Sequence, residues 1–263
     1  MGLTLTGPSA VPLPETARAA RADERRPVLD HGYVRLVDHM GTDLTVVNAA
    51  KVSFDKEAAD FGPREERLLG FLGREGHTSP FRHAMLSFEV YAPLMVARQW
   101  WKYVVGSDHT MDGWNESSRR YVTEEPTFYT IEPRAWRSAP ASRKQGSGEE
   151  LPVEVGERLS AALEDHYARS LARYEGALAA GVAVEQARVF LPAYALYVRW
   201  RWTASLQAVG HFLAQRLADD AQREIAAYAA AVRELTEPHF PHALAAMLGP
   251  AQGDRQGPGG PTD

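Results

Sequence analysis

The sequence predicts an α+β fold, in which a mixed or antiparallel sheet with flanking helices is followed by a helical C-terminal half. Two observations carry this prediction. Between Tyr33 and Tyr129, segments rich in strand-forming residues alternate with short helical patterns. After Val155, apolar residues recur at three- and four-residue spacing, the period of amphipathic helices. Hydrophobic residues make up 44% and charged residues 24% of the 263, which is ordinary for a globular protein.

The elements of the first half follow in order. Residues 44–54 carry Val and Thr at the density of a strand. Residues 65–77 have a helical pattern that Gly76 stops. Residues 85–93 alternate apolar and polar side chains as a half-buried strand does, and Pro93 opens a helix that runs through Trp101. Further strand is expected at 119–122 and 127–131.

The second half is expected to be mainly helical. An apolar stripe defines its first helix, which Gly181 ends; the stripe consists of Leu159, Leu163, Tyr167, Leu171 and Tyr174. A short helix over 184–191 stops before Pro192. Residues 203–220, with Thr203 as N-cap, and residues 221–236 complete the set. Trp200 and Trp202, in an apolar run around Arg201, are expected in the core.

Composition divides the chain into three parts. Residues 1–28 predict a mobile N-terminal arm, residues 29–248 a single domain, and residues 249–263 a disordered tail rich in Gly and Pro. Residues 138–152 are expected to be a surface linker within the domain. No apolar run approaches the ~18 residues of a membrane span, and no signal peptide is evident, so we expect a cytoplasmic protein.

The residue inventory excludes several kinds of chemistry. The chain has no cysteine, which removes disulfides, cysteine-ligated metals and thiolate nucleophiles. No cluster of acids and histidines has metal-ligand spacing, so no metal is predicted. A net charge of −5 gives no reason to expect nucleic acid as a partner, and nothing predicts membrane binding. An imported cofactor is then the expected source of reactivity.

Residues 98–121 hold the densest group of candidate binding residues. This stretch, RQWWKYVVGSDHTMDGWNESSRRY, interleaves cations, amides and hydroxyls with three tryptophans. Arginines present paired donors to phosphate oxygens, and tryptophan faces stack on flat heterocycles. Composition alone favours an ordinary solvated helix and strand here.

The order of short motifs along the chain resembles the flavin-dependent thymidylate synthase family. WNESSRRY resembles the second half of the family signature, Arg-His-Arg followed by Asn-Glu-x-Ser-x-Arg-Tyr, and RQW precedes it as in the family. Four further blocks match in order: NAAKVSF from Asn48, HTSPFRH from His77, ARVFLP from Ala187 and RLADDAQREI from Arg216. Six blocks in the right order make the resemblance specific.

The chain departs from the family pattern at defined places. Lys102-Tyr103-Val104 stands where the family has Arg-His-Arg, and six extra residues, 108–113, lengthen the following loop. Arg82 replaces a Glu, and Asp220 replaces a frequent His. Lysine keeps a charge but not a planar fork, and tyrosine keeps a ring that does not titrate near neutrality. These changes bear on flavin affinity and substrate choice.

The resemblance implies a reaction and an assembly. The expected activity is C5 methylation of dUMP to dTMP with 5,10-methylenetetrahydrofolate, with FAD as redox mediator and NAD(P)H as reductant. A homotetramer with active sites shared between subunits is also implied.

The resemblance also assigns residues. The catalytic residue is Arg216, whose guanidinium would stabilise negative charge on the uracil ring without a thiol at C6. Ser118 and Arg120, with Gln99, would grip the nucleotide phosphate. The implied nucleotide-binding set is Gln99, Lys102, Glu116, Ser117, Ser118, Arg119, Arg120, Arg188 and Arg216. The implied FAD-binding set is Ser53, His77, Ser79, Lys102, Tyr103, Val104, Glu116, Ser205, Gln207 and His211, although His211 fits a core histidine equally well.

Other functions stay open at this point. The altered triplet and longer loop fit a UMP C5-methylase of nucleoside-antibiotic biosynthesis. Loss of Arg-His-Arg fits a catalytically degenerate paralogue that binds a nucleotide without converting it. A helical interaction module would leave the ordered motifs unexplained.

Overall fold

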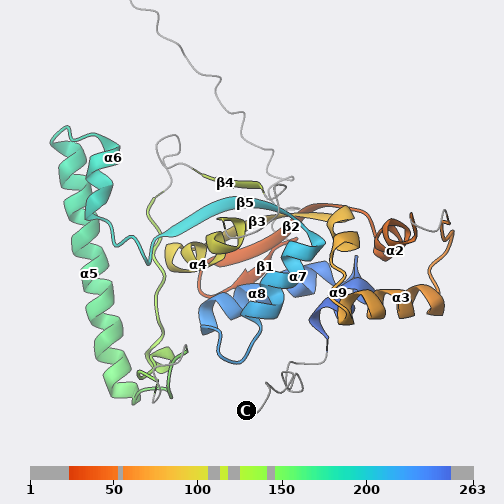
Figure 1. Ribbon diagram of the computed structural model, residues 1–263. Coiled ribbons are helices and arrows are strands. Elements are labelled where there is room, and N and C mark those ends of the chain that lie inside the picture. Colours follow the sequence, from red (N-terminus) through yellow and green to blue (C-terminus); the bar gives the residue numbers. More distant parts are fainter. Residues whose placement is uncertain (1–23, 53–55, 106–112, 118–124, 141–145, 250–263) are drawn as a thin grey trace, which may run out of the picture.

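The computed structural model describes residues 24–52, 56–105, 113–117, 125–140 and 146–249. Within these residues, five strands form one sheet in the order β1-β2-β3-β5-β4 (Figure 1). The strands are β1 (Arg26–Val28), β2 (Gly32–Met40), β3 (Met85–Pro93), β4 (Gly113–Glu116) and β5 (Tyr197–Ser205). Every neighbouring pair is antiparallel, which confirms the predicted fold class.

The apolar face of the sheet is built by β3 and β5. Phe88 is paired with Trp202 and Val90 with Trp200, and all four side chains are buried. Directly opposed residues of antiparallel strands point to the same face, so these side chains form one continuous surface. The alternation of residues 85–93 is thereby confirmed, as is the core position of the two tryptophans.

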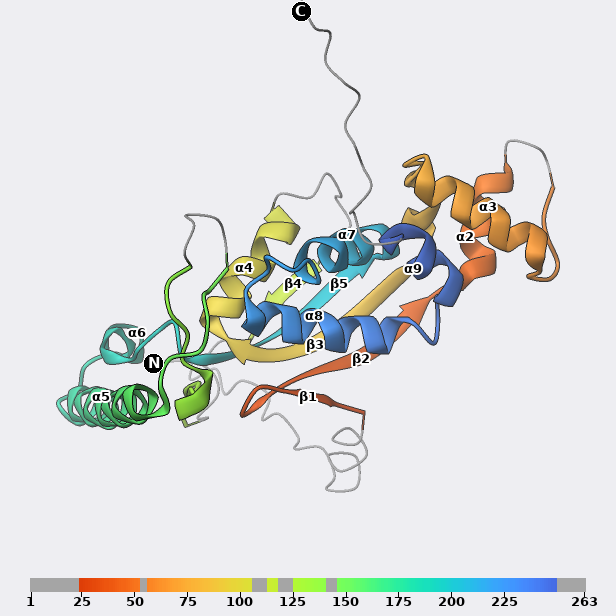
Figure 2. The same cartoon turned by 90° about the horizontal axis from the view of Figure 1, so that it is seen from below.

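Three helices cover this face: α4 (Leu94–Val105), α7 (Leu206–Arg216) and α8 (Arg223–Thr236) (Figure 2). Tyr228 of α8 is buried, and its hydroxyl donates to the Tyr91 carbonyl at 2.9 Å. A Cβ on Gly32 would lie 1.8 Å from the Tyr228 hydroxyl. Glycine at this position therefore lets α8 approach the sheet closely.

A group of short helices packs together beside the end of β2. It comprises α2 (Asp43–Lys51), α3 (Pro63–Arg74), η2 (Ser79–His83) and α9 (Pro241–Leu248). The Asp43 carboxylate accepts from the backbone amides of His242 and Ala243 at 3.0 and 2.9 Å. These bonds satisfy free N–H groups at the start of α9 and fix it against α2.

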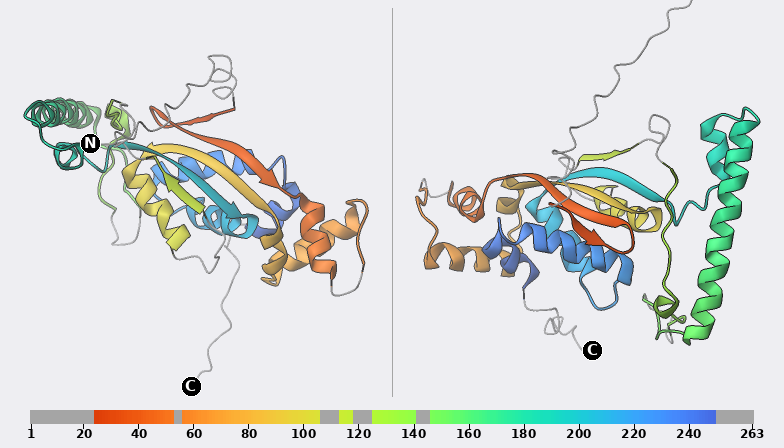
Figure 3. Two further views of the ribbon diagram at one scale, coloured as in Figure 1. Left: turned by 90° about the horizontal axis from the view of Figure 1, so that it is seen from above. Right: turned by 180° about the vertical axis from the view of Figure 1, so that it is seen from behind.

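A helical arm projects from the other end of the molecule (Figure 3). Its elements are η3 (Pro133–Ala135), α5 (Val153–Ala179), α6 (Val184–Ala187) and η4 (Arg188–Phe190). Tyr167 of α5 stacks on Phe128 at 4.9 Å and packs with Leu191 in a small cluster separate from the main core. Gly181, at φ 83°, follows the end of α5 as predicted. None of the helices in the described ranges is long and apolar enough to cross a membrane.

Two predicted elements were wrong. Residues 44–54 are not a strand, because Asp43–Lys51 form α2, whose Val46 and Val47 are buried. A capping box at Thr42 starts this helix, and packing overrides the weak strand preference of Val and Thr. Thr203 is not an N-cap. It lies in β5, and Ser205 caps α7 by accepting from the Ala208 amide at 3.2 Å.

Several other expectations meet the structure only in part. Residues 26–28, which were predicted to belong to the mobile N-terminal arm, form strand β1. Within the described residues 125–131, one isolated bridge, Phe128 with Leu196, stands in place of a strand. The expected linker 138–152 includes backbone pairing between Ser138 and residues 148 and 149. Residues 1–23, 119–122 and 250–263 lie outside the described residues.

Candidate active site

Helix α4 carries the central candidate residues, and its rotation is fixed by Trp100. This side chain is fully buried and stacks on Phe212 of α7 at 4.4 Å. It also meets Trp200 and Trp202 of β5 edge-on at 5.5 and 5.4 Å. With Trp100 and Val96 held in the core, Gln99 and Tyr103 lie on one flank of α4, and Arg98 and Trp101 lie on another.

The first face presents Tyr103 to the C-terminal end of α7. The Arg216 guanidinium carbon lies 5.1 Å from the centre of the Tyr103 ring, and the His211 ring centre lies at 5.7 Å. Burial raises the pKa of Tyr103, while the charge and hydrogen bonding of Arg216 oppose that rise. The Nε atom of Arg216 is buried and has no hydrogen-bond partner in the described part of the chain. An unpaired N–H donor is therefore buried beside an aromatic ring.

Gln99 lies one helical turn before Tyr103 on the same face. Its amide nitrogen donates to the Met95 carbonyl at 3.3 Å and to Oε1 of Gln222 at 2.7 Å. Gln222 precedes α8 and lines a cavity of about 320 Å³ between Met95 of α4 and residues 131–137, 146 and 147. The Arg137–Glu224 ion pair, at 2.5 Å, lies in the wall of that cavity.

The second face of α4 borders an apolar slot against strand β4. The slot has a volume of about 310 Å³ and is lined by Leu94, Ala97, Arg98, Trp101, Trp114 and Glu116. Trp114 stacks on Trp200 at 4.8 Å, and the Arg98 guanidinium lies 5.7 Å from the Trp101 ring centre. Two indole walls with a cation and a carboxyl at the rim suit a planar, polar-edged ring.

Glu116, at the rim of the slot, has a perturbed acidity. Desolvation raises its pKa, and a hydrogen bond from Trp114 and the charge of Arg188 partly oppose the rise. Arg188 lies in η4 of the arm and is exposed. The carboxyl group is thus electrostatically coupled to the arm.

Five of the predicted flavin residues lie at or next to η2 and α7, which pack together: His77, Ser79, Ser205, Gln207 and His211. The other described ones, Lys102, Tyr103 and Val104 on α4 and Glu116 on β4, lie apart from this group in the chain. His77 and Ser79 are exposed where η2 begins, and Gln207 accepts from Arg82 at 2.6 Å. His211 is exposed one turn after Gln207, so it is not a core histidine. Ser205 is only 3% exposed, and its hydroxyl is engaged as the α7 N-cap.

The other predicted residues are placed as follows. Lys102 is exposed on α4, and Ser117, after β4, donates its backbone N–H to the Arg199 carbonyl at 2.8 Å. Val104 lies within α4. Ser53, Ser118, Arg119 and Arg120 lie outside the described residues. Across the described chain, no group of three or more His, Cys, Asp or Glu is arranged to hold a metal ion.

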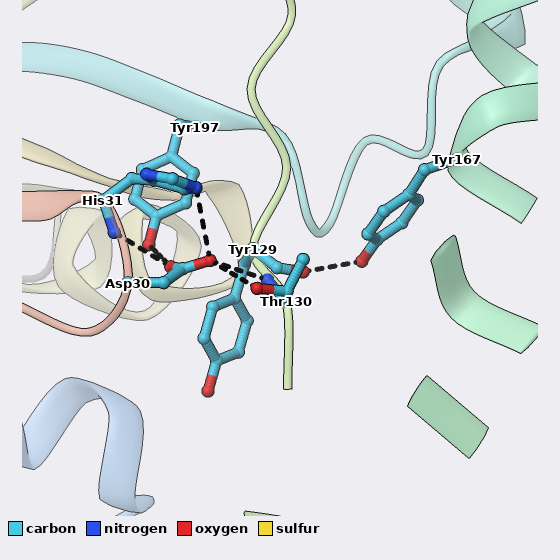
Figure 4. Close-up of polar contacts among 6 residues, drawn as sticks. All are labelled: Asp30, His31, Tyr129, Thr130, Tyr167 and Tyr197. Atoms are coloured by element: carbon cyan, nitrogen blue, oxygen red, sulfur yellow. Dashed lines mark hydrogen bonds and ion pairs between the residues drawn. The ribbon is translucent and has the colours of Figure 1, made fainter. Parts of the chain in front are cut away.

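The sequence reasoning missed the polar cluster that anchors the arm (Figure 4). The Asp30 carboxylate accepts from the Tyr197 hydroxyl at 2.5 Å and from the Thr130 amide and hydroxyl at 2.9 and 2.8 Å. Tyr167 of α5 donates to the Tyr129 carbonyl at 2.8 Å. Thr130 and Tyr197 lie 100 and 167 residues from Asp30 in the sequence, so no local pattern marks these contacts. Gln222 was also missed, although it lies inside the block from Arg216 to Ile225.

Comparisons with known proteins identify relatives over most of the chain. The family model described as thymidylate synthase complementing protein matches residues 35–242. The flavin-dependent thymidylate synthase of Thermus thermophilus is 40% identical over 221 residues, covering 84% of this chain and 77% of that protein. That of Thermotoga neapolitana is 37% identical over 222 residues, covering 84% and 93%.

A solved structure has the same fold. The UMP/dUMP methylase PolB from Streptomyces cacaoi, bound with 5-Br dUMP, matches with a TM-score of 0.70 and 28% identity, over 84% of this chain and 96% of that one. Bound with 5-Br UMP, it matches with a TM-score of 0.70 and 26% identity, over 83% and 94%. The family match, the level of identity and the shared fold agree with the six ordered motifs, and the chain therefore belongs to the thymidylate synthase complementing protein family, that of the flavin-dependent thymidylate synthases.

Proposed function

We propose that this protein converts dUMP to dTMP by reductive methylation at C5, with methylenetetrahydrofolate as carbon donor, FAD as redox mediator and NAD(P)H as reductant. The observation that carries the proposal is the placement of Arg216. Its partly buried guanidinium stands over Tyr103, with Nε buried and unpaired in the described chain. A fixed cation of this kind stabilises negative charge that develops on a uracil ring.

The candidate residues divide between opposite faces of α4. Gln99 and Tyr103 lie toward α7 and the segment before α8, whereas Arg98 and Trp101 line the slot that holds Glu116. At 100° per residue, the two faces are roughly 160° apart around the helix. Glu116 and Arg216 of one protomer therefore flank α4 from different sides, an arrangement that suits a site shared between copies.

A second copy would complete the site, and we infer a homotetramer with shared active sites. Large apolar side chains on and after η4 support this inference: Val189 is 81% exposed and Tyr194 is 73% exposed. They lie close in sequence to Arg188, a predicted nucleotide ligand. Leaving exposed apolar side chains in contact with water is unfavourable. These side chains therefore suit a subunit interface, and such an interface would also contain Arg188.

The described residues around η2 and α7 fit FAD. His77, Ser79 and His211 offer exposed hydrogen-bonding groups, Gln207 is half-buried, and Tyr103 adds an aromatic ring at 5.7 Å from His211. Ser205 supports the surface as the α7 N-cap and does not contact the cofactor in this proposal. When bound, FAD supplies the reducing equivalents that convert the transferred carbon into a methyl group.

The remaining predicted roles extend from this arrangement. Lys102 and Arg188 would contribute positive charges to the nucleotide site, and Ser118 and Arg120 would bind the nucleotide phosphate. Ser53 and Val104 keep the FAD-binding role, and Ser117 and Arg119 the nucleotide-binding role, that the resemblance implies. The cytoplasmic location stays a prediction.

Tritium release tests the proposed reaction directly. Anaerobic incubation of [5-³H]dUMP with FAD, NADPH and methylenetetrahydrofolate should release tritium to water as the methyl group replaces the C5 hydrogen. Parallel detection of dTMP separates methylation from simple exchange. Nucleotide binding with neither product would instead favour the degenerate paralogue.

A second candidate function is methylation of UMP. The solved relative with the same fold is a UMP/dUMP methylase with structures bound to both brominated nucleotides. The altered Lys102-Tyr103-Val104 triplet in α4 gives this alternative a local basis. Tritium release from [5-³H]UMP, measured beside dUMP, gives the preference between the two sugars.

A further inference from the structure

The Gln99 amide is oriented by a chain of hydrogen bonds whose polarity is fixed at one end. The Met95 carbonyl can only accept, so the end of Gln99 that faces it is the NH₂ group. The same nitrogen lies 2.7 Å from Gln222, so Gln222 must present its carbonyl oxygen. Both N–H bonds of Gln99 are thereby used, and the atom left for a ligand is its carbonyl oxygen.

This orientation makes Gln99 a hydrogen-bond acceptor in the candidate site. Phosphate oxygens at neutral pH are acceptors and are repelled by a carbonyl oxygen. The phosphate role that the family resemblance suggested for Gln99 therefore conflicts with the observed bonds. A group with an N–H or O–H bond is the partner that this oxygen accepts.

The position of Gln99 places that acceptor near Tyr103 and Arg216, where the uracil base is proposed to bind. Gln99 and Tyr103 are four residues apart on α4, and such side chains are neighbours, about 6 Å apart. Arg216 stands over Tyr103, and residues 217–222 lead from Arg216 to Gln222. The segment after α7 thus runs from the guanidinium to the residue that orients Gln99.

We propose that Gln222 is a positioning residue that holds Gln99 as an acceptor for a donor group of the nucleotide, either the uracil N3–H or a sugar hydroxyl. The inference rests on the proposed nucleotide substrate and adds a residue and a polarity to it. Gln222 acts through Gln99 and does not itself contact the reacting atoms.

Two substitutions separate acceptor loss from a change of shape. Gln222→Met keeps the length of the side chain but removes the acceptor, so Gln99 loses its fixed orientation. Gln222→Glu keeps an oxygen acceptor, and a carboxylate is compatible with the N-terminal end of α8. Gln222 is exposed and makes no side-chain cap bond to α8, so both variants should fold. Gln186→Met, at an exposed position of α6, is the matched control.

The measurement is equilibrium binding by titration calorimetry to the FAD-loaded protein. The ligands are dUMP, its N3-methyl analogue, its 3′-deoxy analogue, UMP and deoxyuridine, which lacks the phosphate. Gln222→Met should weaken dUMP about three- to tenfold, the effect of one net hydrogen bond. Gln186→Met should bind dUMP as the unaltered protein does, and Gln222→Glu, which retains the acceptor, should bind it more tightly than Gln222→Met. The steady-state KM for dUMP should rise in Gln222→Met with little change in kcat.

The analogues and a double variant make the role specific. The unaltered protein should bind dUMP more tightly than the analogue that lacks the hydrogen-bond donor to Gln99, and this difference in affinity should shrink in Gln222→Met. Comparison of UMP with dUMP tests whether the 2′-hydroxyl group is that donor. The weakening should persist with deoxyuridine, because the phosphate is not the partner. In a Gln99→Met background, Gln222→Met should have no further effect, since the two residues act as one unit.

The outcomes distinguish this inference from the proposed function. If the unaltered protein binds neither dUMP nor UMP, the proposed function fails. If it binds dUMP and Gln222→Met binds equally well, the positioning role is wrong and the function stands. A loss that disappears with deoxyuridine would assign Gln99 to the phosphate and overturn the proposed polarity.

Discussion

The two faces of α4 differ in the chemistry that they expose. On one face, Gln99 and Tyr103 meet Gln222 and Arg216, so polar groups converge on a cation that retains an unpaired N–H. On the other face, Trp101 and Trp114 flank an apolar slot in which Glu116 is the acidic group. The burial of Trp100 fixes the helix between them.

This difference is what the proposed composite site requires of one short helix. A polar pocket stabilises charge on a ring, whereas an aromatic slot binds a flat surface and raises the pKa of its carboxyl group. In the proposed composite site, each protomer would offer two complementary half-sites. Four experiments test this division.

Removing the cation from the polar face should have the largest effect. Arg216→Ala should lower methyl transfer by at least about 100-fold, because the developing negative charge loses its stabilising group. Bound FAD, measured by absorbance, should stay near the unaltered level. Arg64→Ala, at an exposed position of α3, is the control. Substantial activity in Arg216→Ala would remove the catalytic assignment.

Mixing two inactive variants tests whether the faces belong to different subunits of one site. Arg216→Ala and Glu116→Ala should each be inactive alone. After co-expression, roughly a quarter of the sites would combine an intact polar face with an intact slot, so about that share of tritium release should return. Mixed oligomers that stay inactive would indicate that each site is built within one protomer.

The aromatic support under Arg216 should contribute a smaller amount. Tyr103→Leu removes the ring and should cost about 1 kcal/mol of transition-state stabilisation, roughly fivefold in kcat/KM. Tyr103→Phe retains the ring and should lose less. Steady-state kinetics with dUMP compares the two variants. Equal losses would mean that the hydroxyl group, rather than the ring face, supports the guanidinium.

The decrease in nucleotide affinity at low pH should follow the protonation of Glu116 in the slot. Desolvation raises the pKa of Glu116, so binding that needs its carboxylate should weaken as pH falls, starting above the usual range of a glutamate. Arg188→Gln removes a positive charge that lowers this pKa. In this variant the loss of binding at acid pH, the acid limb of the profile, should therefore begin at a higher pH. Dissociation constants for dUMP across pH 4–8 measure the limb. A limb unchanged in Glu116→Gln would assign it to another group.

Local patterns succeeded where burial alternates along one element. Residues 85–93 form the predicted strand, because alternate side chains of a central strand face the core. The same reasoning failed at residues 44–54, where Val46 and Val47 are buried by a helix and not by a strand. Composition could not distinguish the two, since the deciding contacts come from α3, η2 and α9, which lie outside the segment itself.

The sequence by itself determined the family, the fold class and the identities of the candidate residues, because the motifs that carry them are contiguous. Only the tertiary structure decided how these residues face one another. Gln222 meets Gln99 across 123 residues, and Glu116 lines a slot with Arg98 and Trp101 on another flank of α4. Hydrogen-bond polarity and the division into two half-sites depend on distances and orientations, which packing sets and residue order does not encode.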